Sequence, residues 1–283
     1  MTFNEVKAIA DEAYVITNTE RGCSNLTLYP ESNEHLCEIF NNVDVSGKDI
    51  FTVLGSSDQA LSCYYCGAKT IDTFDMVHPS LWYGYLRKWI ILNQNRFYPS
   101  YHFFTDGDEE LYNLICKIVP TNQDEADAQL FWKLYLSKEP HRYMTNYFLF
   151  NAPICSQDKP FLDDIDSVKH FYDNPISFKH LNICKPIDTD KQYDVVILSN
   201  ILEHTVRDKE KVTARENVES LLKDNGIAVC SSLIYNLDTP FHKHEVDVLI
   251  SNDLELVAEY QDYEELVGRN RDIAYVYQKK KRF

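Results

Sequence analysis

The residues best suited to chemistry fall in a short stretch, 49–75, where a small-residue loop and a later acid each follow an apolar run. The loop reads Gly55, Ser56, Ser57, Asp58 and Gln59, and the acid is Asp75. This order predicts a strand, a tight loop, a helix and a second, parallel strand. Such a loop brings backbone N–H groups and a helix N-terminus to a ligand. An acid that closes the second strand accepts hydrogen bonds from ribose hydroxyls, so the stretch predicts a nucleotide-binding site.

The elements that must position these residues follow from the spacing of apolar side chains. The short run 50–54 and the β-branched run 193–200 are typical of strands buried on both faces. Further strands are expected at 70–74, 176–183, 227–233, 254–260 and 273–278, the last two as an antiparallel pair at the sheet edge. Helices are expected at 59–65, from 78 to 92 and at 212–222. Gly67 suits the position after a helix, Pro79 suits a first helical turn, and 224–226 reads as a tight turn.

Two regions do not alternate strand and helix. Residues 1–46 read as a helical lead-in or lid, and residues 93–165 as a helical insertion into a main domain that spans 47–283. Within the insertion, 124–136 carries apolar residues at helical spacing. We expect these two regions to cover one side of the sheet and to form the pocket for a second substrate. Possible lining residues are Tyr29, Tyr83, Arg87 and Trp89, for which simple packing is the alternative.

Composition excludes several classes of protein. The chain has 283 residues and a formal charge of −16, which argues against a duplex nucleic-acid partner because backbone phosphates would be repelled. The basic run 279–282 reads as a solvated tail. No apolar run approaches ~20 residues, so no transmembrane segment is expected. The first residues lack the apolar stretch of a secretory signal, which predicts a cytoplasmic protein.

The eight cysteines show no paired framework, as expected of free thiols in a reducing compartment. Cys63 and Cys66 form one C-x-x-C, without a second pair at zinc-ribbon spacing, so core packing is the better interpretation. His242, His244 and Glu245 are loosely spaced and read as a solvated loop. No metal site is therefore predicted.

Four stretches together resemble class I S-adenosylmethionine-dependent methyltransferases. They are the loop 53–59, Asp75, the strand and turn 193–204, and the turn 221–229, which resembles the leucine-leucine-lysine-proline-glycine-glycine motif of that family. The resemblance covers about 47–235 apart from the insertion. It implies an α/β, Rossmann-like methyltransferase fold, with a mostly parallel seven-stranded sheet, an antiparallel edge strand and the helical insertion. It also implies S-adenosyl-L-methionine as the cofactor.

The loop, followed by 67–69 and 73–75, also resembles a narrower bacterial branch. That branch is related to the transferases of betaine-lipid synthesis, which move a 3-amino-3-carboxypropyl group from the same cofactor. The chain departs from the wider family in two places. Only Gly55 remains of three loop glycines, with Ser57 and Gln59 at the other two places. Val53 replaces the acid expected near the cofactor's amino group, a contact that Asp58 or Gln59 would then supply.

The resemblance implies a set of cofactor-binding residues. These are Gly55, Ser56, Ser57, Asp58, Gln59, Asp75, Met76 beside the adenine, Asn182 and Ile183 at the end of the third strand, and Ser199 and Asn200 at the end of the fourth. Local structure offers alternatives: Ser56 and Gln59 fit a capping box, and Asp75 fits a cap for the helix at Pro79.

Two residues are candidates for catalysis. Asn200 faces the expected position of the sulfonium, and His204 has a pKa suited to proton removal near pH 7. A structural histidine in the next helix is the alternative for His204. Three functions stay open at this point: methyl transfer to a small-molecule or lipid acceptor, 3-amino-3-carboxypropyl transfer, and cofactor binding without catalysis. The sequence does not indicate the oligomeric state.

Overall fold

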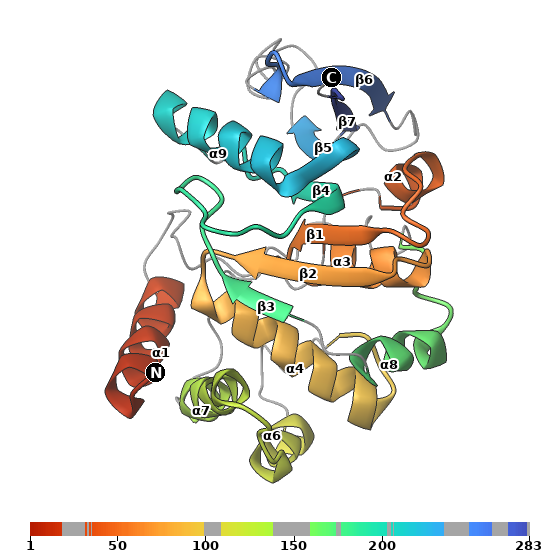
Figure 1. Cartoon of the computed structure of the whole chain (residues 1–283). Helices are drawn as coiled ribbons and strands as arrows, with labels where there is room; N and C mark the ends of the chain where they lie inside the picture. Colours follow the sequence, from red (N-terminus) through yellow and green to blue (C-terminus); the bar gives the residue numbers. More distant parts are fainter. Residues whose placement is uncertain are drawn as a thin grey trace.

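The structure, a computed structural model, is a single sheet with helices on both faces and a helical layer beyond one edge (Figure 1). It describes residues 1–18, 32, 34, 36–98, 109–137, 159–173, 177–202, 205, 207–234, 249–261 and 271–281. The strands are β1 (Asp49–Val53), β2 (Thr70–Asp75), β3 (Ser177–His180), β4 (Tyr193–Ser199), β5 (Leu222–Ile234), β6 (Leu254–Gln261) and β7 (Arg271–Lys279). The helices are α1 (Phe3–Asn18), α2 (Leu36–Asn42), α3 (Asp58–Tyr65), α4 (His78–Gln94), α6 (Glu109–Lys117), α7 (Gln123–Leu136), α8 (Ile165–Asp173) and α9 (Asp208–Leu221).

The strand order is β3-β2-β1-β4-β5-β7-β6. Neighbours from β3 to β5 pair in parallel, and β7 pairs antiparallel with both β5 and β6. The predicted fold class, a mostly parallel seven-stranded Rossmann-like sheet, is confirmed, and its antiparallel strand is β7, next to the outermost strand β6. The chain runs outward from β1 in one direction and from β4 in the other. The boundary between β1 and β4 is thus the switch point at which sheets of this kind bind ligands.

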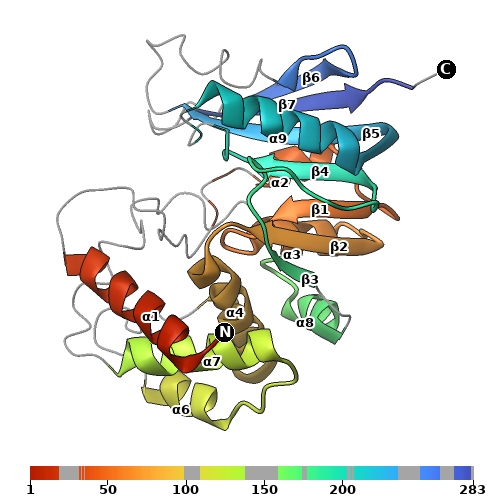
Figure 2. The ribbon, with the colours of Figure 1, turned by 60° about the vertical axis from the view of Figure 1, so that its left-hand side comes forward.

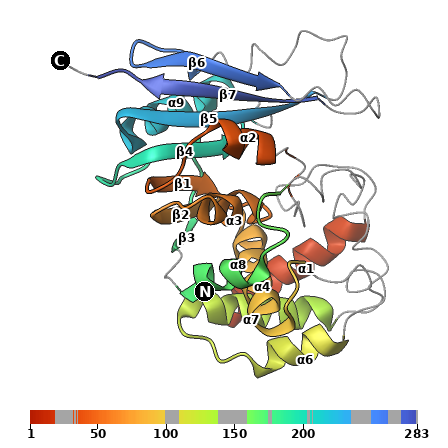
Figure 3. The same cartoon turned by 90° about the vertical axis from the view of Figure 1, so that its right-hand side faces the viewer.

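Alternation of side chains explains why both faces of the sheet are covered. In β4, Val195 and Ile197 join the core beneath α2, α3 and α8, whereas Val196 and Leu198 join the core beneath α9. Figure 3 shows α2, α3 and α8 on the near side of the sheet and α9 on the far side. A strand that is apolar at every position therefore needs helices on both sides.

The lead-in and the insertion meet in one helical layer. Helices α1, α4, α6 and α7 share a core that includes Val6, Trp82 and Trp132, and Figure 2 shows them grouped beyond β3. The Trp132 indole nitrogen donates a hydrogen bond to the Trp82 carbonyl at 2.8 Å. The terminal amine of Met1 forms an ion pair with Asp127 at 2.6 Å. These contacts join the first residues of the chain to α7.

Several local predictions need correction. The third strand ends at His180, not at residue 183, so Asn182 and Ile183 lie in the turn that follows it. The expected turn at 224–226 is an irregularity within β5: the pairing with β4 jumps from Leu222 to Ile227 and leaves three extra residues. Gly67, with φ +88°, and Pro79, in the first turn of α4, stand where they were predicted.

The structure also describes three of the four residues that were possible lining residues of a pocket. Tyr83, Arg87 and Trp89 are all fully buried in the packing of α4, so packing is the correct interpretation for them. Tyr29 lies outside the described residues. No helix in the described ranges is both long and apolar enough to cross a membrane.

Candidate functional site

The candidate site lies at the carboxyl ends of β1, β2 and β4, on both sides of the switch point. The loop 54–57 follows β1, Asp75 ends β2 and Ser199 ends β4. Three residues in this small area have left-handed backbone: Gly55 with φ 48°, Ser57 with φ 74° and Ser199 with φ 53°. Non-glycine residues adopt this conformation at a cost, and such residues are concentrated at functional sites.

Ser57 explains how the loop tolerates the loss of glycine. It stands at the second of the three expected glycine positions, and its backbone is left-handed, as a glycine there would be. It caps α3 without a side-chain hydrogen bond, so the predicted capping box does not form. Instead, the Ser56 hydroxyl accepts from the N–H of Asp58 at 3.3 Å. The loop thus keeps its shape with a strained serine.

Asp75 is brought against the loop, as the spacing predicted. One of its carboxylate oxygens accepts from the Gly55 N–H at 3.2 Å, and the other accepts from the Val77 N–H at 2.9 Å. The second contact supports the start of α4, so the capping role is real. Burial raises the pKa of Asp75 to about 6, although hydrogen bonds from Val77, Gly55 and Ser80 oppose the rise. With the backbone N–H of Met76, four protein groups hydrogen-bond the Asp75 carboxylate, about as many as a carboxylate accepts.

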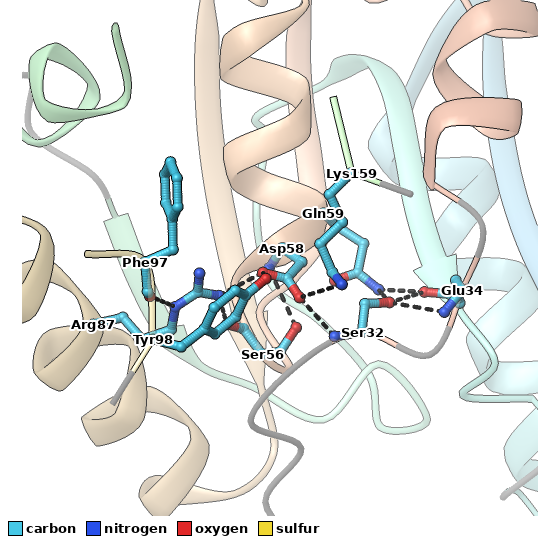
Figure 4. A network of polar contacts seen from close by, with 9 residues as sticks. All are labelled: Ser32, Glu34, Ser56, Asp58, Gln59, Arg87, Phe97, Tyr98 and Lys159. Atoms are coloured by element: carbon cyan, nitrogen blue, oxygen red, sulfur yellow. Dashed lines mark hydrogen bonds and ion pairs between the residues drawn. The ribbon is translucent and has the colours of Figure 1, made fainter. Parts of the chain in front are cut away.

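Asp58 is the centre of a buried network that fixes the start of α3 (Figure 4). Its carboxylate accepts from Arg87 Nη1 at 2.6 Å, from the Ser32 N–H at 2.6 Å and from the Tyr98 hydroxyl at 3.1 Å. Lys159 Nζ lies 4.0 Å away. Arg87 also donates to the carbonyls of Ser56 and Phe97. Asp58 therefore anchors the start of α3. Both of its carboxylate oxygens are engaged by protein groups, which leaves neither free for the expected contact with the cofactor's amino group.

Glu34 is the residue that the sequence did not reveal. It precedes α2 in the lead-in and is 1 % exposed. Its Oε2 accepts hydrogen bonds from the Gln59 amide and, at 2.9 Å, from the Ser199 hydroxyl, so it spans the ends of β1 and β4. Burial raises the pKa of Glu34, and hydrogen bonds from Ser231, Ser199, Gln59 and Ser32 oppose the rise. A single acid before an amphipathic helix carries no signal that would identify it.

The remaining predicted contacts lie around the rim. Met76 is half exposed, and its carbonyl lies 3.0 Å from the Nε2 atom of His180. Ile183 is buried against α9, and its carbonyl accepts from Asn217 at 2.7 Å. The Asn182 side chain accepts from the Cys184 N–H at 2.8 Å. Asn182 and Ile183 therefore hold the turn after β3, and Met76 presents its side chain at the end of β2.

The catalytic candidates are placed only in part. Ser199 ends β4 beside Glu34, and Asn200 follows the strand, with its side-chain oxygen 3.4 Å from the Ser199 hydroxyl. His204 and Glu203 lie outside the described residues, as do His242, His244 and Glu245. Within the described residues, His, Cys, Asp and Glu side chains form no group of three that could hold a metal ion. Burial raises the pKa of Cys63 well above its usual range, in keeping with a thiol of the core.

Comparisons with known proteins concern the fold. No protein-family model matches the chain, and no curated protein matches it by sequence. Among solved structures, the chain is similar to the N-methyltransferase NodS from Bradyrhizobium japonicum WM9 in complex with S-adenosyl-L-homocysteine. The identity is 9 %, the TM-score is 0.46, and the match covers 96 % of this chain and 99 % of the other.

Two further solved structures are similar to the chain. The [4+2]-cyclase SpnF is 10 % identical, with a TM-score of 0.46 and coverage of 96 % and 93 %. A TehB-like SAM-dependent methyltransferase from Corynebacterium glutamicum is 10 % identical, with a TM-score of 0.40 and coverage of 99 % and 100 %. Likeness at this level concerns architecture alone, and one architecture supports many reactions. The strand order itself defines the class of fold, a Rossmann-like sheet of the methyltransferase type.

Proposed function

We propose that the protein is an S-adenosyl-L-methionine-dependent transferase that moves a methyl group to an acceptor. The observation that carries this proposal is Asp75, a buried carboxylate beside the left-handed loop at the switch point of the sheet. An acid at the end of the second strand is placed to bind both hydroxyls of a ribose. Burial raises the pKa of this carboxyl to about 6, although hydrogen bonds from the protein oppose the rise.

The chain's own residues fit the cofactor in a defined way. Asp75 would hold the ribose, Gly55 would let the backbone approach the ligand, and Met76 would lie beside the adenine. When bound, the cofactor supplies the chemistry, because its sulfonium makes the attached carbon open to in-line displacement. The protein must bind and orient the acceptor, and Ser199 and Asn200 border the end of β4 where this would occur. The division into a lid of 1–46, a main domain of 47–283 and an insertion of 93–165 belongs to the same proposal.

Binding to S-adenosylhomocysteine, measured by calorimetry, is the first test. Asp75→Ala should weaken this binding by about 1–3 kcal/mol, the value of hydrogen bonds to a charged acceptor. Asp72→Asn is a suitable control, because Asp72 lies on the same strand but bonds Lys179, Lys191 and Tyr193. A folded Asp75→Ala variant with unchanged affinity would contradict the ribose assignment.

The by-product then identifies the group transferred. Methyl transfer leaves S-adenosylhomocysteine, whereas 3-amino-3-carboxypropyl transfer leaves methylthioadenosine. Incubation of the protein with S-adenosylmethionine and candidate small-molecule or lipid acceptors, followed by chromatography, distinguishes them. Absence of binding to both S-adenosyl compounds by the folded protein would instead favour a protein that keeps the fold without the cofactor.

A further inference from the structure

Three buried oxygen atoms without hydrogen-bond partners belong to residues at the candidate site. Among the described residues, Glu34 Oε1, Gln59 Oε1 and Ser57 Oγ are buried and have no partner. Glu34 and Gln59 touch each other, because the Gln59 amide nitrogen donates to Glu34 Oε2 (Figure 4). Each of these two side chains thus keeps one buried oxygen without a partner, and Ser57 stands two residues before Gln59 in the loop. Burying polar atoms unpaired costs free energy, so each such atom calls for an explanation.

These atoms share one chemical property. A carboxylate oxygen and an amide oxygen only accept hydrogen bonds, and a hydroxyl accepts as well as donates. The group that satisfies them must be a donor with several N–H bonds. An ammonium group has three such bonds and no acceptor, so it matches a set of convergent oxygens.

The charge of the site points to the same conclusion. Within the described residues, the side chains that hydrogen-bond the Glu34 carboxylate are neutral: Ser32, Gln59 and Ser199. The buried cations nearby, Arg87 and Lys159, pair with Asp58 instead. A buried carboxylate is stable when a cation accompanies it. These hydrogen bonds therefore orient the Glu34 carboxylate, but none of these partners carries a positive charge that would balance it.

The position of Glu34 decides which cation this is. It spans Gln59, just after β1, and Ser199, at the end of β4, so it lies across the switch point where the proposed cofactor would lie. Val53, which ends β1, is apolar and offers no acid of its own. Ser199 holds its hydroxyl on Glu34 from a left-handed backbone conformation, a strain of the kind found at ligand sites.

We propose that Glu34, supplied by the lead-in, binds the α-ammonium group of S-adenosylmethionine together with Gln59. This inference rests on the proposed function and deepens it, because it assigns recognition of the amino-acid end of the cofactor to a residue outside the glycine loop. It makes the lead-in part of the binding site. Ligands that keep the α-ammonium group should therefore depend on Glu34, and ligands that lack it should not.

Calorimetry with three ligands tests this. S-adenosylmethionine carries both a sulfonium and an ammonium, S-adenosylhomocysteine carries the ammonium alone, and methylthioadenosine carries neither. Glu34→Gln should weaken binding of the first two ligands at least 10-fold and leave methylthioadenosine within 2-fold. Glu38→Gln is the matched control, since Glu38 lies four residues later and bonds Asn42 at the surface. That control should leave all three affinities unchanged.

The alternative outcomes are distinct. A loss confined to S-adenosylmethionine would place Glu34 at the sulfonium and overturn the ammonium assignment. An equal loss for all three ligands would show that Glu34 only shapes the crevice, and unchanged affinities would also overturn the inference. If the wild-type protein binds none of the three ligands, the proposed function itself fails. If it binds methylthioadenosine and S-adenosylhomocysteine equally, only the role of the amino-acid end fails.

Discussion

At the scale of single residues, the site is built from side chains and backbone that are individually unfavourable. Ser57 and Ser199 hold left-handed backbone, and Asp75 and Glu34 are carboxylates in nearly complete burial. Each costs stability when considered alone, and the surrounding fold must hold it in place. Their convergence on the ends of β1, β2 and β4 is what makes this edge of the sheet the candidate site.

Ser57 offers a direct test of strain. Ser57→Gly should stabilise the fold by about 0.5–1 kcal/mol. Glycine accepts a φ of 74° without the penalty of a Cβ atom, and the greater entropy of glycine in the unfolded chain offsets only part of this gain. The gain can be measured by urea unfolding. Ser57→Ala, which removes the unpartnered hydroxyl but keeps Cβ, should gain less, because the left-handed backbone stays strained. Equal stabilisation in both variants would show that the hydroxyl, not the backbone, is the source of the strain.

The sequence predicts residues of this site unevenly. Gly55, Asp75 and Ser199 are predictable because each lies at a fixed place relative to a strand end. Glu34 is not, because its position depends on how the lead-in crosses the finished sheet. The role of Asp58 is equally hidden, since Arg87, its ion-pair partner, lies 29 residues later on another helix.

At the scale of elements, one buried ion pair joins three segments. Arg87 of α4 bonds Asp58 at the start of α3, the Ser56 carbonyl in the loop and the Phe97 carbonyl after α4. Burial alone would lower the pKa of Arg87, but the neighbouring Asp58 carboxylate raises it overall. This pair sets the position of α3 relative to α4, and hence the position of the loop at the site.

Removal of the arginine should therefore be severe. Arg87→Met should destabilise the protein by about 3–5 kcal/mol, because among the described residues it leaves the more distant Lys159 as the cation beside the buried Asp58 charge. The double variant Arg87→Met with Asp58→Asn should recover part of this loss. Lys88→Met is the control: its ion pair with Glu125 is partly exposed, so about 0–1 kcal/mol is expected. Urea unfolding of the four proteins measures these differences, and a mild effect of Arg87→Met would mean that the network is dispensable.

Strands and helices of the main sheet were largely predictable, because runs such as 195–198 are apolar at every position. The length of β3 and the irregularity in β5 were not. β3 is short because residues beyond His180 turn to support α9, as the Ile183 carbonyl does through Asn217. In β5, the turn residues at 224–226 are accommodated inside the strand by a shift in pairing with β4. Both depend on neighbours that are distant in sequence.

At the scale of the whole molecule, the lead-in contributes to two separate parts of the structure. Helix α1 joins α4, α6 and α7 in the layer beyond β3, whereas Ser32 and Glu34 reach the crevice at the switch point. The lead-in therefore contacts both the helical layer and the sheet. The sequence of the lead-in predicted a helix but did not predict these two sets of contacts. Amphipathic spacing identifies the buried face of a helix but not the surface against which that face packs.

The pH dependence of folding and of binding should run in opposite directions at Asp75. Its folded pKa, about 6, lies above the ordinary value of an aspartate, so the stability linked to its protonated form is present below the unfolded pKa and is lost as the pH rises through 6. The wild-type protein should thus lose up to about 3 kcal/mol relative to Asp75→Asn between pH 4 and 7.5. Over the same interval, affinity of the wild type for S-adenosylhomocysteine should increase, because the ionised carboxylate is the better acceptor for ribose hydroxyls.

Asp72 on the same strand provides a control of opposite sign. Although burial opposes it, hydrogen bonds from Lys191, Tyr193 and Lys179 lower the pKa of Asp72, so its contribution to stability is present at neutral pH and lost in acid. Urea unfolding and calorimetry at each pH, with both asparagine variants, separate the two effects. If Asp75→Asn follows the wild type in both profiles, Asp75 titrates outside this range. The expected result is that stability falls and affinity rises with pH only when Asp75 is present. The ionised form of Asp75 would then be the form that binds the ligand better and the form in which the folded protein is less stable.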